Sequence, residues 1–130
     1  EACLHTLAQG LLDLGLLSRN RCPDVQAVLE QRAYQPFYMH RTSHWLGMDV
    51  HDCGSVTEPG EGKAARVLRP GMVLTIEPGL YVRPAEGVPG HFWNIGIRIE
   101  DDALVTEAGC ELTTRDVPVR VEEIEALMRG

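Results

Sequence analysis

The chain has 130 residues, 44% of them hydrophobic and 24% charged, which is enough for one domain, or part of one, with a core of its own. The net charge of −7 argues against a nucleic-acid partner, because phosphate binding needs clustered lysine and arginine. Apolar runs such as Leu14 to Leu17 are far too short to span a bilayer, so we expect no membrane association.

Apolar spacing predicts two helices in the first third of the chain. A leucine stripe over residues 2–17, closed by Gly15 and the polar residues 18–20, is typical of an amphipathic helix. Pro23 stands where a second helix would begin, and residues 24–34 continue that helix until Pro36 ends it. No period dominates residues 38–54, which are rich in histidine, glycine and aspartate.

The second half of the chain predicts strands and a final helix. Residues 72–77 and 95–100 have the apolar, β-branched composition of strands, and residues 80–82 resume the first strand after Pro78. Asp101 and Asp102 are expected to form a hairpin turn into a strand over residues 103–106, and residues 122–128 a short helix. Gly60 to Lys63 is interpreted as a turn, because it lacks phosphate-loop spacing. This order predicts an α+β fold with an antiparallel sheet.

The four cysteines form no metal-binding or redox pair. Cys3, Cys22, Cys53 and Cys110 are widely scattered, and no two of them have C-x-x-C spacing. We interpret them as free thiols in a reducing compartment, which predicts a cytoplasmic location.

Three histidines lie within twelve positions. His40 and His44 are four residues apart, and His51 is followed directly by Asp52. The zincin motif is excluded, because Arg41 stands where that motif requires the glutamate base. A single histidine is more often a structural hydrogen-bonding residue than a ligand, but three of them beside an aspartate favour a functional cluster.

Two glutamates, Glu77 and Glu100, end predicted strands. The two-residue period places Glu77 on the same face as Val73 and Thr75. In the second strand, the isoleucines at positions 95, 97 and 99 share one face, which we expect in the core, while Arg98 and Glu100 project from the other. A surface ion pair is the simpler explanation of that charged face. Gly96 on the same face instead indicates close approach by a backbone or a ligand.

One histidine and two glutamates are suitable ligands for a divalent metal. A carboxylate can bridge two ions, and ions in such sites convert water into a nucleophile at neutral pH. Residue types and spacing therefore favour metal-assisted hydrolysis.

Three ordered motifs resemble those of aminopeptidase P, the Xaa-Pro aminopeptidases of the pita-bread metallopeptidases. The first runs from His40 to Asp52 with the sequence HRTSHWLGMDVHD, the second from Pro70 to Tyr81 and the third from Ile95 to Asp102. Serine before His44 is more similar to aminopeptidase P than to prolidase, which usually has glycine there. The resemblance implies a C-terminal part of the pita-bread fold, in which helices flank a curved antiparallel sheet.

The resemblance also implies a cofactor and its ligands. Two divalent ions, usually Mn²⁺, would occupy the cleft of the sheet. By position, His44 and Glu77 would bind one ion, and Glu100 would bridge both. The substrates would be peptides with proline at the second position, and the full-length enzyme would be a homo-oligomer.

Further roles follow from the same motifs. Hydroxide activated by the ions would attack the carbonyl before proline, with Glu77 as proton acceptor. His51 would contact the substrate and stabilise the tetrahedral intermediate. His40 would hydrogen-bond in the substrate pocket, and Arg98 with Tyr81 would orient carboxylates around the ligands.

One departure from the family pattern concerns two aspartate ligands that it places before the histidine motif. Asp13 and Asp24 are suitably separated, but both lie in predicted helices. The chain also opens at Glu1 directly in an apolar stripe. We therefore expect residues 1–130 to be the C-terminal portion of a catalytic domain whose upstream portion is absent, and we expect this portion alone to have little or no activity.

Two other functions stay open. A prolidase, restricted to Xaa-Pro dipeptides, is the alternative enzyme, whereas methionine aminopeptidase fits the histidine segment poorly. A pita-bread module that has lost its metals and recognises peptides or proteins is the alternative outside enzymes. Intact His44, Glu77 and Glu100 favour the enzyme.

Overall fold

A computed structural model describes residues 1–60 and 64–130 and divides the chain into two compact units. The first unit comprises residues 1–41 and 78–98, and the second comprises residues 42–77 and 99–130. Of the turn predicted at Gly60 to Lys63, the last three residues lie outside the described part. Helices and antiparallel strands occur in both units, which confirms the α+β prediction. In residues 1–60 and 64–130, no helix has the length and hydrophobicity of a membrane span.

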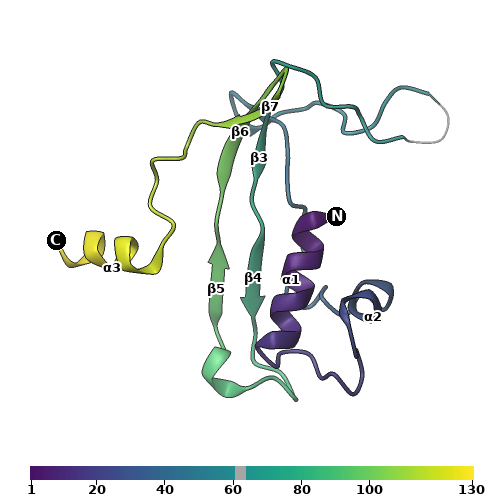
Figure 1. Cartoon of the computed structure of the whole chain (residues 1–130), viewed down its shortest axis with the longest axis vertical. Helices are drawn as coiled ribbons and strands as arrows, with labels where there is room; N and C mark the ends of the chain where they lie inside the picture. Colours follow the sequence, from purple (N-terminus) through teal and green to yellow (C-terminus); the bar gives the residue numbers. More distant parts are fainter. Residues whose placement is uncertain (61–63) are drawn as a thin grey trace. The chain divides into compact units, whose positions relative to one another are not determined.

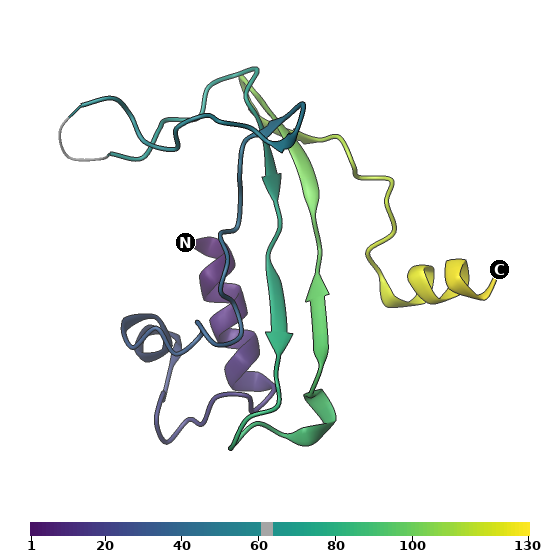
Figure 2. The ribbon, with the colours of Figure 1, turned by 180° about the vertical axis from the view of Figure 1, so that it is seen from behind.

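The first unit packs two helices on a two-stranded ribbon. Its elements are α1 (Ala2–Asp13), α2 (Val25–Glu30), β4 (Gly79–Val82), the 3-10 helix η1 (Gly90–Phe92) and β5 (Ile95–Arg98). α1 lies beside β4, and α2 lies on the other side of α1 (Figures 1 and 2). Two clusters of buried side chains hold these layers together, Ala8, Leu12, Cys22 and Val28 in one, and Leu11, Leu16, Phe37 and Val82 in the other.

Both helices are shorter than the apolar stripes predict. α1 ends at Asp13, because Gly15 adopts a left-handed φ of +69°, and Leu16 then turns back and is buried in the core. α2 begins after Asp24, whose carboxylate accepts a hydrogen bond of 2.8 Å from the Ala27 N–H. It ends four residues before the predicted Tyr34, because Arg32 at φ 53° reverses the chain.

The isoleucine face of β5 is not in the core, which contradicts the sequence-based expectation. Ile95 and Ile97 pair with Val82 and Leu80 and so share their side of the ribbon. They are nevertheless 42% and 60% exposed, and Ile99 is 46% exposed. Within the first unit, α1 packs against β4 rather than β5. The alternation of residues in the sequence therefore identified which β5 side chains share a face, but it did not show that α1 leaves this face uncovered.

The second unit contains a three-stranded antiparallel sheet in the order β3-β6-β7, formed by Val73–Ile76, Asp101–Thr106 and Gly109–Leu112. The short strands β1 (Leu46–Gly47) and β2 (Val50–His51) form a separate hairpin, which the sequence did not predict. A bridge between Trp45 and Leu74 joins the start of this hairpin to β3. α3 (Val121–Arg129) confirms the last predicted helix, and every one of its residues is exposed.

The predicted turn at Asp101 and Asp102 is wrong, because these residues begin β6. They pair with Ile76 and Thr75 of β3, and the turn falls at residues 107–108 instead. Thr114 supplies the reason: its hydroxyl donates to the Asp101 carboxylate at 2.9 Å and accepts from the Asp102 N–H at 3.0 Å. Thr114 is thirteen residues from Asp101 and twelve from Asp102, and a turn rule that considers only neighbouring residues cannot take it into account.

Candidate metal centre

His44 lies in an extended segment that is hydrogen-bonded to β3. The Thr75 N–H donates to the His44 carbonyl at 3.0 Å, and the Glu77 N–H donates to the Thr42 carbonyl at 2.7 Å. These bonds place the His44 side chain next to Glu77, which follows β3 directly and is 8% exposed. Residues 33 positions apart are thus fixed together by backbone pairing within the second unit.

Glu100 completes a group of three metal-ligating side chains. It lies in the link before β6, outside any strand. One ligand atom from each of His44, Glu77 and Glu100 lies within 4.8 Å of the other two. His44 is partly buried, Glu77 is buried and Glu100 is exposed, so the group has a sheltered side and a solvent side. The structure therefore brings together the three residues that the sequence assigned to metal binding.

The hydrogen bond of the His44 ring decides which nitrogen can bind a metal. Nδ1 lies 2.8 Å from the Trp45 carbonyl, which can only accept, so Nδ1 carries the proton. Nε2 is therefore the nitrogen that is left to bind a metal, and it lies 3.4 Å from the Glu77 Oε1. Two electron-rich atoms at this distance repel each other unless a cation or a proton lies near both. An imidazole nitrogen and two carboxylates suit a divalent ion such as Zn²⁺ or Mn²⁺, so the residues fit the metal that the motifs imply.

Thr75 is a residue of this centre that the sequence did not identify. It is 1% exposed, and its hydroxyl accepts from the His44 N–H at 3.1 Å and donates to Glu77 Oε1 at 3.2 Å. One hydroxyl thus connects the backbone of one candidate ligand to the side chain of another. The two-residue period that places Thr75 and Glu77 on one face was the available signal.

His51 lies beside the three-residue group but is not a member of it. Its ring packs edge-on against the ring of His44, with the two centroids 4.3 Å apart. His51 ends the β1-β2 hairpin, where Val50 has a left-handed φ of 66°, and its side chain is exposed. An exposed imidazole next to the candidate ligands is in a position to contact a bound substrate.

The remaining predicted residues form a chain of hydrogen bonds in the first unit. His40 Nδ1 lies 2.8 Å from the Arg41 carbonyl, which assigns the proton to Nδ1. His40 Nε2 then accepts from the Tyr81 hydroxyl at 2.9 Å, and that hydroxyl accepts from Arg98 Nε at 2.8 Å. The sequence singled out all three residues, and the structure shows that Tyr81 connects the other two.

Gly96 makes room for this chain. It pairs with Tyr81 across β4 and β5, and a Cβ at position 96 would lie 3.1 Å from the Tyr81 ring. The predicted close approach at Gly96 is therefore made by an aromatic side chain of the neighbouring strand, rather than by a backbone or a ligand.

An α+β chain that gathers one histidine and two glutamates beside an antiparallel sheet has the features of a metallopeptidase. Comparison with known families agrees, since residues 19–107 match the model of metallopeptidase family M24. The chain belongs to this family.

Two curated relatives illustrate the similarity within the family. The chain is 50% identical to the Xaa-Pro aminopeptidase of Escherichia coli K12 over 125 residues, which cover 96% of the chain and 26% of that protein. It is 40% identical to the Xaa-Pro dipeptidase of Rattus norvegicus over an alignment that covers 98% of the chain and 31% of the relative. The chain thus spans about a quarter to a third of the length of these proteins.

A solved structure supports the fold assignment. The aminopeptidase PepP of Pseudomonas aeruginosa superposes with a TM-score of 0.86 at 48% identity, over 97% of this chain and 27% of that one. The likeness to an aminopeptidase P confirms the predicted pita-bread fold class.

Proposed function

We propose that this chain forms part of a metal-dependent peptidase that hydrolyses the bond between an N-terminal residue and a following proline. The supporting observation is the convergence of His44, Glu77 and Glu100, with His44 Nε2 3.4 Å from Glu77 Oε1. The similarity to Xaa-Pro aminopeptidases supplies the substrate class.

In this proposal His44, Glu77 and Glu100 would contribute to holding two divalent ions. Bound ions would polarise the substrate carbonyl and lower the pKa of a nearby water. Three ligands are too few for two ions, and among the described residues the group has three members. We therefore propose that two further carboxylates come from a part of the enzyme outside these 130 residues, and that the chain alone is weak or inactive.

The chain's own residues have distinct roles in this proposal. Glu77 accepts the proton of the attacking water, because its carboxylate is sheltered and Thr75 orients one of its oxygens. His51, exposed beside His44, donates a hydrogen bond to the oxygen that becomes negative as the carbonyl is attacked. His40 and Tyr81 contact the substrate. Arg98 donates a hydrogen bond to the Tyr81 hydroxyl and so fixes its position beside His40.

Manganese, cytoplasmic location and homo-oligomeric assembly complete the proposal. A ligand set rich in carboxylate oxygens suits Mn²⁺ better than it suits metals that prefer thiolate ligands. The four cysteines are all free, as expected of a protein in a reducing compartment.

A substitution at Glu100 tests the proposed centre. In the complete enzyme, Glu100→Ala should remove the bridging ligand and abolish the two-metal site together with nearly all activity. Glu107→Ala, in the exposed turn between β6 and β7, is the matched control and should change neither property. Metal analysis after manganese reconstitution, combined with a tripeptide hydrolysis assay, measures both. Full metal content in the Glu100 variant would contradict the ligand assignment.

An Xaa-Pro dipeptidase is the second candidate, favoured by the 40% identity to the rat enzyme. Rates on Xaa-Pro dipeptides and Xaa-Pro-Xaa tripeptides separate the two enzymes, and a strict dipeptide preference would overturn the aminopeptidase proposal. A complete protein that binds no divalent ion after manganese reconstitution would instead be a peptide-binding module.

A further inference from the structure

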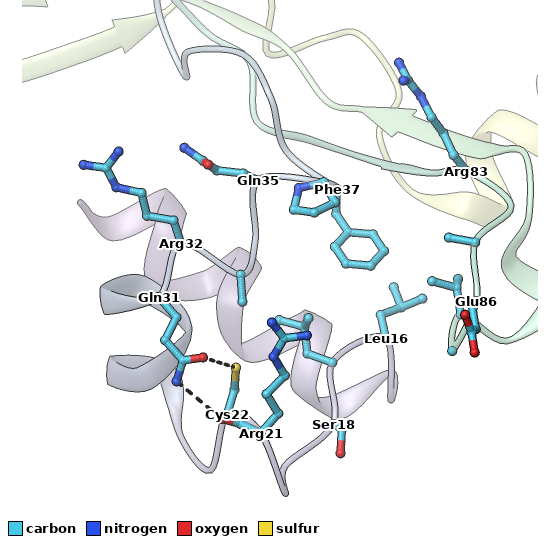
Figure 3. Close-up of a pocket in the computed structure, with 16 residues that line it drawn as sticks. Leu16, Ser18, Arg21, Cys22, Gln31, Arg32, Gln35, Phe37, Arg83 and Glu86 are labelled. Carbon is cyan, nitrogen blue, oxygen red and sulfur yellow. Dashed lines mark hydrogen bonds between the residues drawn. The ribbon is translucent and has the colours of Figure 1, made fainter.

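A cavity of about 840 Å³ lies in the first unit and shares no residue with the candidate metal centre. Its walls come from the connection between α1 and α2, from the segment that follows α2, and from the loop between β4 and β5 (Figure 3). This volume is within the range of small-molecule sites.

Apolar side chains form the inner surface of the cavity. Leu16 and Phe37 are 5% and 6% exposed and belong to the core between α1 and β4. Leu17 and Val88, which pack against the same core, also line the space. An organic molecule that enters the cavity would therefore meet a preformed apolar surface.

Hydrogen bonds fix the wall between the two helices. The Gln31 side chain donates to the Arg21 carbonyl at 3.3 Å, and its oxygen lies 3.7 Å from the buried Cys22 sulfur (Figure 3). These contacts tie the end of α2 to the α1-α2 connection. The wall that carries Arg21 is thus ordered before any ligand binds, which lowers the entropic cost of binding.

The charge of the lining is opposite to that of the whole chain. Three arginines and one glutamate line the cavity of a protein with net charge −7. Within the described part of the chain, no ion pair or side-chain hydrogen bond is found for Arg21, Arg32 or Arg83. Figure 3 shows the Arg21 side chain directed into the cavity, whereas the guanidinium groups of Arg32 and Arg83 point outward from its rim.

Arg32 occupies a backbone position that normally favours glycine. It ends α2 with a φ of 53°, and the Ala33 N–H donates to the Val28 carbonyl at 3.0 Å, as in a Schellman motif. An L-residue there costs about 1 kcal/mol relative to glycine. The sequence nevertheless places a cation at this strained position on the rim of the cavity.

We propose that this cavity binds a small organic anion with an apolar body, such as a medium-chain carboxylate. The hydrocarbon part packs against Leu16, Phe37 and Val88. The carboxylate pairs with the Arg21 guanidinium in a charge-assisted hydrogen bond. Arg32 and Arg83 add a positive potential at the rim that attracts the anion.

Calorimetric titration of the complete, manganese-reconstituted enzyme with octanoate tests this site. Octanoate should bind saturably, while octanamide, which keeps the body but not the charge, should bind about tenfold more weakly. Inorganic phosphate, an anion without an apolar body, should not compete. Phosphate that binds as tightly as octanoate, or octanamide that binds equally well, would overturn the proposed ligand chemistry.

Substitutions locate the binding. Arg21→Gln should weaken octanoate binding about tenfold or more, and Arg21→Lys should restore part of it. Arg19→Gln is the matched control, because Arg19 pairs with Asp13 and does not line the cavity. Circular dichroism verifies that each variant is folded. Equal affinity in the wild type and the Arg21→Gln variant, or no saturable binding at all, refutes the site whether or not the peptidase proposal holds.

Discussion

At the scale of single residues, the hydroxyl of Thr75 connects two candidate ligands that backbone pairing has brought together. It accepts from the His44 backbone and donates to the Glu77 carboxylate, so each ligand is oriented through the same buried atom. Partners that orient ligands in this way commonly contribute strongly to metal affinity.

Thr75→Val is therefore expected to weaken Mn²⁺ binding in the complete enzyme by about 10- to 100-fold. Valine keeps the shape of threonine but leaves the His44 N–H without its acceptor, which also costs about 1–3 kcal/mol of stability. Thr75→Ser retains the hydroxyl and should bind Mn²⁺ nearly as tightly as the wild type. Manganese titration measures the affinity, and an unchanged value in the valine variant would show that the hydroxyl does not orient the ligands.

His51→Ala should separate substrate contact from metal binding. The ring packs against His44 but lies outside the three-residue group, so the metals should stay bound. The kcat on a tripeptide should fall by about 10² to 10³, as for the loss of one oxyanion donor. Metal content and kcat are measured on the same sample, and loss of metal would identify His51 as a ligand.

At the scale of elements, the β4-β5 ribbon holds Tyr81 between His40 and Arg98. Tyr81 pairs with Gly96 across the strands, and the missing side chain at Gly96 leaves room for one edge of the Tyr81 ring. The Arg98 guanidinium carbon lies 5.9 Å from the centroid of the same ring. The ribbon thus defines the position of one hydroxyl through its register.

Gly96→Val tests the need for this close approach. The added Cβ would lie 3.1 Å from the Tyr81 ring, so the ring must shift and its hydrogen bonds to His40 and Arg98 should lengthen or break. We expect a lower kcat with little loss of metal in the complete enzyme. Gly90→Val is the control, because a Cβ there meets nothing within 4 Å. Normal activity in the Gly96 variant would show that the ring position is unimportant.

At the scale of the whole molecule, the candidate ligands all belong to the second of the two compact units. A ligand that binds only the folded state stabilises it by about 2.7 kcal/mol at a concentration of 100 Kd. Metal should therefore protect the unit that supplies its ligands more than the other.

Hydrogen exchange measures this difference. In the complete enzyme, saturating Mn²⁺ should slow amide exchange in β3 and β6 by up to about 100-fold. Its effect on amide exchange in α1 and α2 should be much smaller. Mg²⁺, which loses its water reluctantly, is the control and should protect less. Equal protection of the two units would mean that they unfold together, and no protection at all would contradict the metal centre.

Much of the candidate site could be predicted from the sequence because its residues carry chemical signals. Three histidines in twelve positions and a glutamate at the end of an apolar strand are unusual, and the ordered motifs made their relation specific. The α+β class followed from periodicity in the same way. The helix ends were less predictable, because Gly15 and Arg32 reverse the chain inside apolar stripes that continue past them.

By itself, the sequence indicated which side chains could bind a metal, because that depends on residue type. It also placed Glu77 on the face of Thr75, because that depends on the local period. Only the tertiary structure showed that Thr75 connects His44 with Glu77 and that the isoleucine face of β5 is exposed. It also showed that Asp101 and Asp102, which bond to Thr114, begin β6 instead of forming a turn. These outcomes depend on partners distant in the chain, and local sequence does not record which distant surfaces will meet.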